Sequence, residues 1–159
     1  MSQADDRLAI MDKIYRYCRS VDRLDVPAGH SCWHADGTAK FPRYEGSGRG
    51  WIDFICEEHL LFLDHSHQVT NILIELDGDR AGSESYVTAT LRRDEGERIV
   101  LVEFWARYLD TWSKRDGEWA IDHRECVVDY GATREIQPIP TNGQARRDAA
   151  DPSYAVLKG

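Results

Sequence analysis

The fold is decided by residues 99–109, which read IVLVEFWARYL. Apolar residues at both odd and even positions are typical of a β-strand that is covered on both faces. One predicted face carries Val100, Val102, Phe104 and Tyr108, and the other carries Ile99, Leu101, Trp105 and Leu109. We expect one of these faces to cover helices and a pocket, and the other to lie against another subunit.

Other strand-like segments surround this stretch. Four segments rich in Val, Ile, Thr, Tyr and Trp lie near residues 67–76, 80–92, 98–113 and 118–130. The turns between them contain Asp77-Gly78, Asp94-Glu95-Gly96 and Asp116-Gly117, which are typical of hairpins. Because a short turn returns the chain beside the preceding strand, these segments predict an antiparallel meander.

Helical patterns precede the strands. Between Asp5 and Leu24 apolar residues recur at spacings of three and four, with Ser2 or Asp5 as the candidate cap, and Pro27 and Gly29 end the pattern. Residues 32–44 predict a short bent strand or hairpin, and residues 51–63 predict a second helix. The sequence therefore predicts a single α+β domain over residues 1–159, in which a curved antiparallel sheet wraps around N-terminal helices.

Two further segments carry no element in this prediction. The glycines at 46, 48 and 50 follow no apolar strand and lack a Walker lysine, so we do not expect a phosphate-binding loop there. After about Gly131 the chain has no periodicity, and we expect an extended C-terminal tail over residues 132–159.

Composition excludes several classes of function. The chain has 159 residues and a formal net charge of −8, with no basic stripe that could neutralise nucleic-acid phosphates. No apolar run is long enough to suggest a membrane span, and the acidic N-terminus does not resemble a signal peptide. The four cysteines are scattered, which indicates small buried residues in a reducing cytoplasm.

A histidine at the head of the first long strand is the main candidate for chemistry. His67 follows the helix that carries Tyr17 and Asp22, and precedes the last strand, which carries Arg124. In one apolar pocket these side chains would provide a general base, the carboxylate that orients it, a proton donor and an anion holder. This set needs no metal and no cofactor.

Alternatives remain for each of these residues. Asp25 competes with Asp22 for the carboxylate role, and His65 with His67 forms a His-x-His pair that could bind metal, although no further ligand stands out. An arginine among small apolar residues needs a carboxylate or a ligand, so Arg124 could instead form a structural ion pair with Glu84 or Glu103.

The whole pattern resembles the nuclear-transport-factor-2-like superfamily and, more narrowly, its SnoaL-like group. The resemblance rests on residues 16–25 (RYCRSVDRLD), 67–71 (HQVTN), 116–119 (DGEW) and 151–154 (DPSY). It implies a cone-shaped α+β barrel. Two classes of cofactor-free lyases in this group, bile-acid 7α-dehydratases and hexachlorocyclohexane dehydrochlorinases, use an Asp–His dyad and an arginine, which fall on Asp22, His67 and Arg124. Tyr17 stands where the dehydrochlorinases have lysine, which favours loss of water over loss of halide.

The resemblance therefore implies a dehydratase that acts on an apolar cyclic or polycyclic hydroxylated carbonyl compound. An isomerase or polyketide cyclase would begin with the same proton abstraction, and a non-catalytic ligand carrier or assembly subunit would use the pocket alone. We expect the residues that contact substrate to be Phe41, Tyr44, Asn71 and Trp105. The expected partners are a small apolar molecule and further copies of the chain, as a trimer by resemblance or a dimer, with no nucleic acid and no membrane.

Overall fold

The computed structural model describes residues 2–157, and its first element is the predicted N-terminal helix, α1 (Gln3–Arg23). Ser2 caps α1 in a capping box with Asp5, which satisfies backbone donors at the helix start. The helix ends where Leu24 adopts a left-handed conformation, with φ of 54°. A short helix, α2 (Val26–His30), follows at once, with Pro27 in its first turn. The predicted helix is thus confirmed almost to the residue.

The sheet has six strands in the order β2-β1-β6-β5-β4-β3. Their bounds are β1 (Trp33–Phe41), β2 (Tyr44–Ser47), β3 (Asp64–Asp77), β4 (Arg80–Asp94), β5 (Ile99–Arg115) and β6 (Glu118–Ile136). The predicted meander of β3 to β6 is confirmed, because each of these strands is antiparallel to the next. One pairing differs from an all-antiparallel sheet: β1 lies parallel to β6, so the sheet is mixed. No tight turn joins these two strands, and local turn signals therefore say nothing about their direction.

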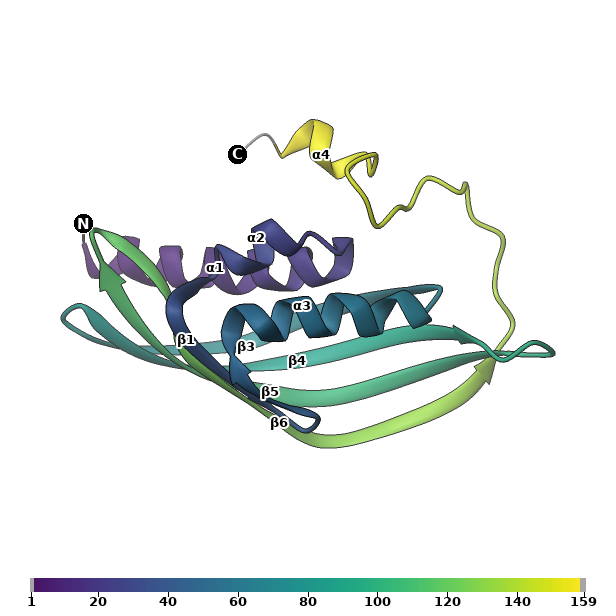
Figure 1. Cartoon of the computed structure of the whole chain (residues 1–159), viewed down its shortest axis with the longest axis horizontal. Coiled ribbons are helices and arrows are strands. Elements are labelled where there is room, and N and C mark those ends of the chain that lie inside the picture. Colours follow the sequence, from purple (N-terminus) through teal and green to yellow (C-terminus); the bar gives the residue numbers. More distant parts are fainter. Residues whose placement is uncertain (1, 158–159) are drawn as a thin grey trace.

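A second helix, α3 (Gly48–Glu58), lies on the concave side of the sheet beside α1 (Figure 1). Ser47 caps it, so it begins before the predicted start at residue 51, and it continues into a 3₁₀ turn, η1 (His59–Leu61). Gly48 lets this helix approach β1 closely, since a Cβ there would lie 2.0 Å from a ring carbon of Trp33. The curved sheet and the two helices enclose the apolar core between them.

β-Bulges shape the long strands. The β5–β6 pairing shifts register between Trp105 and Ala106 and again between Thr111 and Trp112, and the β3–β4 pairing shifts between Thr70 and Leu73. Asn71, within the last of these, has φ of 50°, a left-handed conformation that asparagine tolerates better than most residues. Such bulges bend a strand and increase its twist, which helps the sheet to curve over the helices.

The C-terminal segment differs from the expected tail. β6 continues to Ile136, beyond the predicted end near Gly131. The chain then crosses back over the helices, on the side away from the sheet, to a last short helix, α4 (Ser153–Val156), near α2 (Figure 1). No helix among the described residues is long and apolar enough to cross a membrane.

Candidate active site

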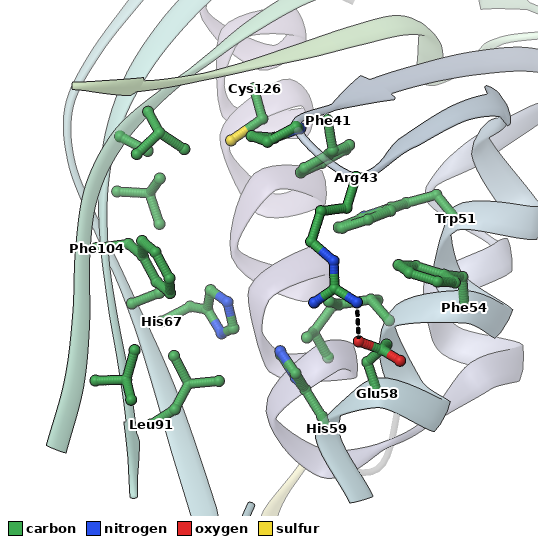
Figure 2. Close-up of a pocket in the computed structure, with 18 of the residues that line it drawn as sticks. Phe41, Arg43, Trp51, Phe54, Glu58, His59, His67, Leu91, Phe104 and Cys126 are labelled. Carbon is green, nitrogen blue, oxygen red and sulfur yellow. Dashed lines mark hydrogen bonds and ion pairs between the residues drawn. The ribbon is translucent and has the colours of Figure 1, made fainter. Parts of the chain in front are cut away.

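A mainly apolar pocket of about 370 Å³ lies between the concave sheet face and helices α1 and α3 (Figure 2). Its walls include Tyr17 and Val21 from α1, Trp51, Phe54 and Ile55 from α3, and Val87, Val102, Phe104, Ala106, Tyr108, Cys126 and Val128 from the sheet. The pocket meets solvent beside Arg43, whose side chain is 74% exposed and forms an ion pair with Glu58 at 2.7 Å. The volume suits a small organic molecule.

The predicted Asp–His pair forms in this structure. The Nδ1 atom of His67 lies 2.7 Å from Oδ1 of Asp22, and the backbone N–H of His67 donates to the other carboxylate oxygen at 3.0 Å. The carboxylate thus holds both the ring and the main chain of the strand that carries it. An acceptor at Nδ1 places the ring proton there and leaves Nε2 as the basic nitrogen.

Asp22 and Tyr17 reach the site from different sides of α1. Tyr17 lines the apolar pocket, whereas Asp22 lies in an adjacent polar recess of about 270 Å³ with Arg19 and Arg23. His67 lines both spaces, so its ring connects the carboxylate to the apolar pocket. Residues five apart on a helix, such as Tyr17 and Asp22, point roughly 140° away from each other, so they cannot both face one pocket directly. The ring of His67 links the two spaces in which they lie.

Tyr17 is a buried phenol with a defined partner. Its hydroxyl oxygen accepts a hydrogen bond of 2.7 Å from the indole N–H of Trp51. Burial raises the pKa of Tyr17 above its ordinary value, and the nearby Arg124 only partly opposes this, so the phenol stays protonated. No side chain or carbonyl among residues 2–157 accepts its proton. Tyr17 can therefore donate to a bound oxygen.

Arg124 is fully buried beneath the pocket and does not line it. Its guanidinium forms two hydrogen bonds with the Asp110 carboxylate, at 2.7 and 2.8 Å, and lies 4.1 Å from the ring centroids of both Tyr17 and Tyr108. Burial disfavours its charged form, but the Asp110 carboxylate outweighs that effect and raises the pKa of Arg124. The partner of Arg124 is thus Asp110, and neither Glu84 nor Glu103.

Of the four residues expected to contact substrate, only Phe41 lines the pocket. Its ring stacks on Trp51 at 3.6 Å between centroids, and Tyr44 packs edge-on against Trp51 at 5.5 Å without lining the pocket. Asn71 is exposed at its β-bulge, where its backbone conformation explains its presence. Trp105 lies on the convex sheet face, stacked on Tyr130 at 4.5 Å.

His59, which the sequence reasoning missed, also lines the pocket. It belongs to η1, and its ring centroid lies 5.7 Å from that of His67 and 4.2 Å from that of His65. Trp51, Ile55 and His59 are spaced four residues apart and all line the pocket, so the helical period of α3 was the signal that could have identified it. His65 is turned away, since its Nε2 lies 2.9 Å from the carbonyl of Val21.

The cysteine in the pocket wall is not activated. Burial raises the pKa of the Cys126 thiol to about 12, with nearby Arg124 opposing the shift. The thiol therefore stays protonated and contributes apolar surface. All four cysteines are free, and no group of three or more His, Cys, Asp or Glu side chains in the described part of the chain could hold a metal ion.

The class of protein follows from comparison with known sequences and structures. The chain belongs to the SnoaL-like domain family, whose sequence profile matches residues 2–125. This places it in the nuclear-transport-factor-2-like superfamily, as the fold predicts. No curated protein sequence matches the chain.

Solved structures with the same fold include proteins named as lyases. A protein with the provisional name scytalone dehydratase, from Novosphingobium aromaticivorans DSM 12444, superposes with a TM-score of 0.72 at 22% identity, covering 90% of this chain and 97% of that one. Hexachlorocyclohexane dehydrochlorinase LinA-type3 from Novosphingobium barchaimii LL02 gives 0.77 at 20% identity, covering 87% and 97%. A protein of unknown function from Mycobacterium tuberculosis gives 0.67 at 24% identity, covering 97% and 92%. At these identities the likeness establishes the fold.

Proposed function

We propose that this protein is a cofactor-independent lyase, a dehydratase that acts on an apolar cyclic or polycyclic hydroxylated carbonyl compound. One observation carries the proposal: Asp22 holds His67 through the ring Nδ1 and the backbone N–H, and His67 lines the apolar pocket. A carboxylate bound in this way fixes the tautomer of an imidazole and stabilises its protonated form. The fold neighbours named as a dehydratase and a dehydrochlorinase support elimination as the reaction class.

The reaction begins at His67. Its Nε2 takes the proton from the carbon beside the substrate carbonyl, and the electrons of that C–H bond form an enolate. The enolate then expels a hydroxyl group from the adjacent carbon, and the departing oxygen takes a proton from the imidazolium or from Tyr17. Proton transfer by a positioned base contributes about 10²–10⁴-fold to the rate.

Two residues assist in this scheme. Tyr17 accepts from Trp51 and so directs its own proton toward a bound oxygen, either the carbonyl or the leaving hydroxyl. Arg124 does not touch the pocket, and we assign it a positioning role, because its cation lies against the face of the Tyr17 ring. The apolar walls exclude water, which strengthens each of these polar interactions.

A hydrogen-exchange experiment tests the proposal. The protein is incubated in D₂O with β-hydroxy ketones built on one-, two- and three-ring scaffolds, and the products are followed by NMR and mass spectrometry. We expect deuterium at the carbon beside the carbonyl, together with loss of the mass of water. Asp22→Asn and His67→Ala should abolish both signals, and His30→Ala, a histidine outside the pocket lining, is the matched control.

The products also separate the proposed reaction from its alternatives. Exchange without loss of water, together with conversion of a β,γ-unsaturated ketone to its conjugated isomer, would identify an isomerase. Binding of these ketones without exchange would identify a ligand carrier. Full exchange by a folded His67→Ala variant would contradict the assignment of the base.

A further inference from the structure

The wall of the apolar pocket contains a second imidazole that the proposed reaction has not yet used. His59 is 5% exposed, and its ring points from the end of α3 toward His67 (Figure 2). The two rings are nearly parallel, with an interplanar angle of 27° and a centroid distance of 5.7 Å. At this separation both rings can contact adjacent atoms of one small ligand.

The two nitrogens of the His59 ring have different surroundings. Nδ1 is buried and has no hydrogen-bond partner. Nε2 has no partner within residues 2–157 either, but it is not buried, so it faces the open space of the pocket that the ring lines. The ring nitrogen available to a ligand is therefore Nε2.

The charge of His59 follows from what surrounds it. Burial is the main cause that lowers the pKa of His59, and together with the nearby His65, His67 and Arg147 it brings that pKa to about 2. Arg147 also donates to the backbone carbonyl of His59 at 2.8 Å, which keeps a cation beside the ring. Because no carboxylate of residues 2–157 pairs with the ring, His59 is neutral throughout the physiological range.

A neutral imidazole carries one N–H, and burial decides which nitrogen holds it. A proton on Nδ1 would leave a buried N–H without an acceptor, which is rarer in proteins than an unsatisfied acceptor. A proton on Nε2 leaves only a bare acceptor in the buried position and directs the N–H into the pocket. His59 is thus a hydrogen-bond donor to the pocket, whereas His67, with its proton on Nδ1 beside Asp22, is an acceptor.

We infer that His59 is a catalytic residue that donates a hydrogen bond from Nε2 to the carbonyl oxygen of the substrate. This inference rests on the proposed function and completes its electrostatics. When His67 removes the proton from the neighbouring carbon, the electron pair moves to the carbonyl oxygen, and the His59 N–H stabilises that charge. The electron pair then returns from the carbonyl oxygen and expels the hydroxyl group, which leaves as water with the proton that His67 had taken. His59 keeps its own proton throughout, and Tyr17 is free to serve the leaving hydroxyl.

The tautomers can be tested without any ligand. Long-range ¹H–¹⁵N correlation spectra of the imidazoles should give His59 as the neutral Nε2–H form at every pH from about 5 to 8. His67 should give the Nδ1–H form when it is neutral. A His59 ring that titrates near an ordinary value of about 6.5, or that carries its proton on Nδ1, would overturn the inference.

A binding experiment tests the donor itself, with 2-naphthol and naphthalene as probes that differ by one oxygen. The variants are His59→Phe, which keeps a ring without a donor, and His59→Gln, which keeps an N–H. We expect His59→Phe to weaken naphthol binding about five- to tenfold, as for one hydrogen bond, and to leave naphthalene binding unchanged. His59→Gln should retain most of the preference for naphthol, and His30→Phe, which replaces a histidine bonded to Asp53, is the control. Equal losses for both probes, or no preference for naphthol in the unmodified protein, would contradict a donor at this position.

Turnover separates this inference from the function on which it rests. On any ketone that undergoes exchange, His59→Phe should lower kcat by about 10²-fold, the usual cost of removing one oxyanion donor. An inactive His67→Ala variant beside a fully active His59→Phe variant would refute the role of His59 and leave the lyase proposal standing. A fully active His67→Ala variant would refute the assignment of His67 as the base, whatever His59 does, and the absence of turnover by the unmodified protein on every ketone would refute the lyase proposal.

Discussion

Replacing Arg124 by methionine should destabilise the protein strongly, because it would leave a charge without its partner. Arg124 is 0% exposed and Asp110 is 3% exposed, and their two hydrogen bonds, at 2.7 and 2.8 Å, are both short. Without the guanidinium, the one contact that the described residues leave to the Asp110 carboxylate is that of the Ser83 hydroxyl at 3.5 Å. Breaking a buried pair in this way costs about 3–5 kcal/mol.

The expected change in melting temperature follows from the size of the chain. For a domain of this length each kcal/mol lowers Tm by about 2–4 °C, so Arg124→Met should melt about 6–20 °C below the unmodified protein. Loss of the cation from the faces of Tyr17 and Tyr108, at 4.1 Å from each ring, adds to the effect. Thermal melting by circular dichroism, with urea unfolding as a second measure, provides the assay.

The double variant Arg124→Met/Asp110→Leu is the matched control. Replacing both members of a buried pair by apolar side chains is often neutral, so the double variant should recover most of the lost stability. If it does so while exchange activity stays low, Arg124 serves catalysis by positioning Tyr17. Two results would refute the reasoning: a single variant that melts within about 1 °C of the unmodified protein, or a double variant no more stable than the single one.

Four further predictions concern Tyr17, the C-terminal segment, the convex face and metal. Tyr17→Phe should lower kcat less than Asp22→Asn does if its hydroxyl only assists departure of the leaving group, and a single-turnover assay compares them; equal losses would make Tyr17 the acid. Asp151 accepts hydrogen bonds from Ser153 and from the backbone of Arg146, which lower its carboxyl pKa. The ionised Asp151 carboxylate therefore stabilises the fold above the unfolded pKa of about 3.9, and this stabilisation is lost as pH falls through the lower folded pKa. Asp151→Asn should reduce Tm at pH 7, and the difference in Tm between the variant and the unmodified protein should close only in acid. A difference in Tm that stays constant down to pH 2 would contradict this. We expect the convex face that carries Trp105 to be buried in an oligomer, a trimer by resemblance. Light scattering should therefore give a smaller particle for Trp105→Glu than for the unmodified protein. A monomeric unmodified protein would disprove this prediction. Activity should survive dialysis against a chelator, and recovery of lost activity on adding a divalent ion would reject the mechanism.

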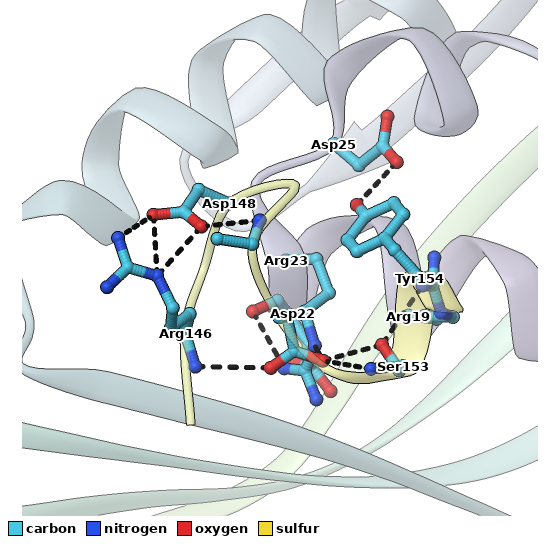
Figure 3. Close-up of polar contacts among 10 residues, drawn as sticks. Arg19, Asp22, Arg23, Asp25, Arg146, Asp148, Ser153 and Tyr154 are labelled. Carbon is cyan, nitrogen blue, oxygen red and sulfur yellow. Dashed lines mark hydrogen bonds and ion pairs between the residues drawn. The ribbon is translucent and has the colours of Figure 1, made fainter. Parts of the chain in front are cut away.

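The C-terminal segment makes contacts that no local pattern indicates. Tyr154 donates a hydrogen bond of 2.7 Å to Asp25 (Figure 3). Arg23 forms an ion pair with Asp151 at 3.4 Å. Arg23 ends α1 and Asp25 follows it closely, so both contacts lie beside the last turn of α1, which carries Asp22. Asp25 was the alternative to Asp22 as the carboxylate that orients His67. It caps α2 and binds Tyr154 of α4, whereas Asp22 contacts His67. The sequence contains both carboxylates at similar positions, and only their surroundings distinguish them.

Some active-site residues could be predicted from the sequence, and others could not. The resemblance identified Asp22 and His67, and the hydrogen bond between them follows from elements whose positions the sequence predicted well. Asn71 and Trp105 follow the same strand patterns but do not line the pocket. A period of two residues assigns a side chain to one of two faces, but it does not say which face is concave or where a bulge reverses the order.

The sequence by itself determined the features that depend on neighbouring residues: the cap and apolar face of α1, the hairpins from β3 to β6, and the α+β class. Tertiary structure decided the partner of Arg124. In the register set by the turn, where Arg115 faces Glu118, Arg124 would lie opposite Leu109; the bulge between Thr111 and Trp112 moves it opposite Asp110 instead. A shift of one residue also changes the face on which a side chain lies, so it brings the guanidinium inward beneath Tyr17. Such a shift arises from packing the whole sheet against the helices, and no short stretch of sequence contains it.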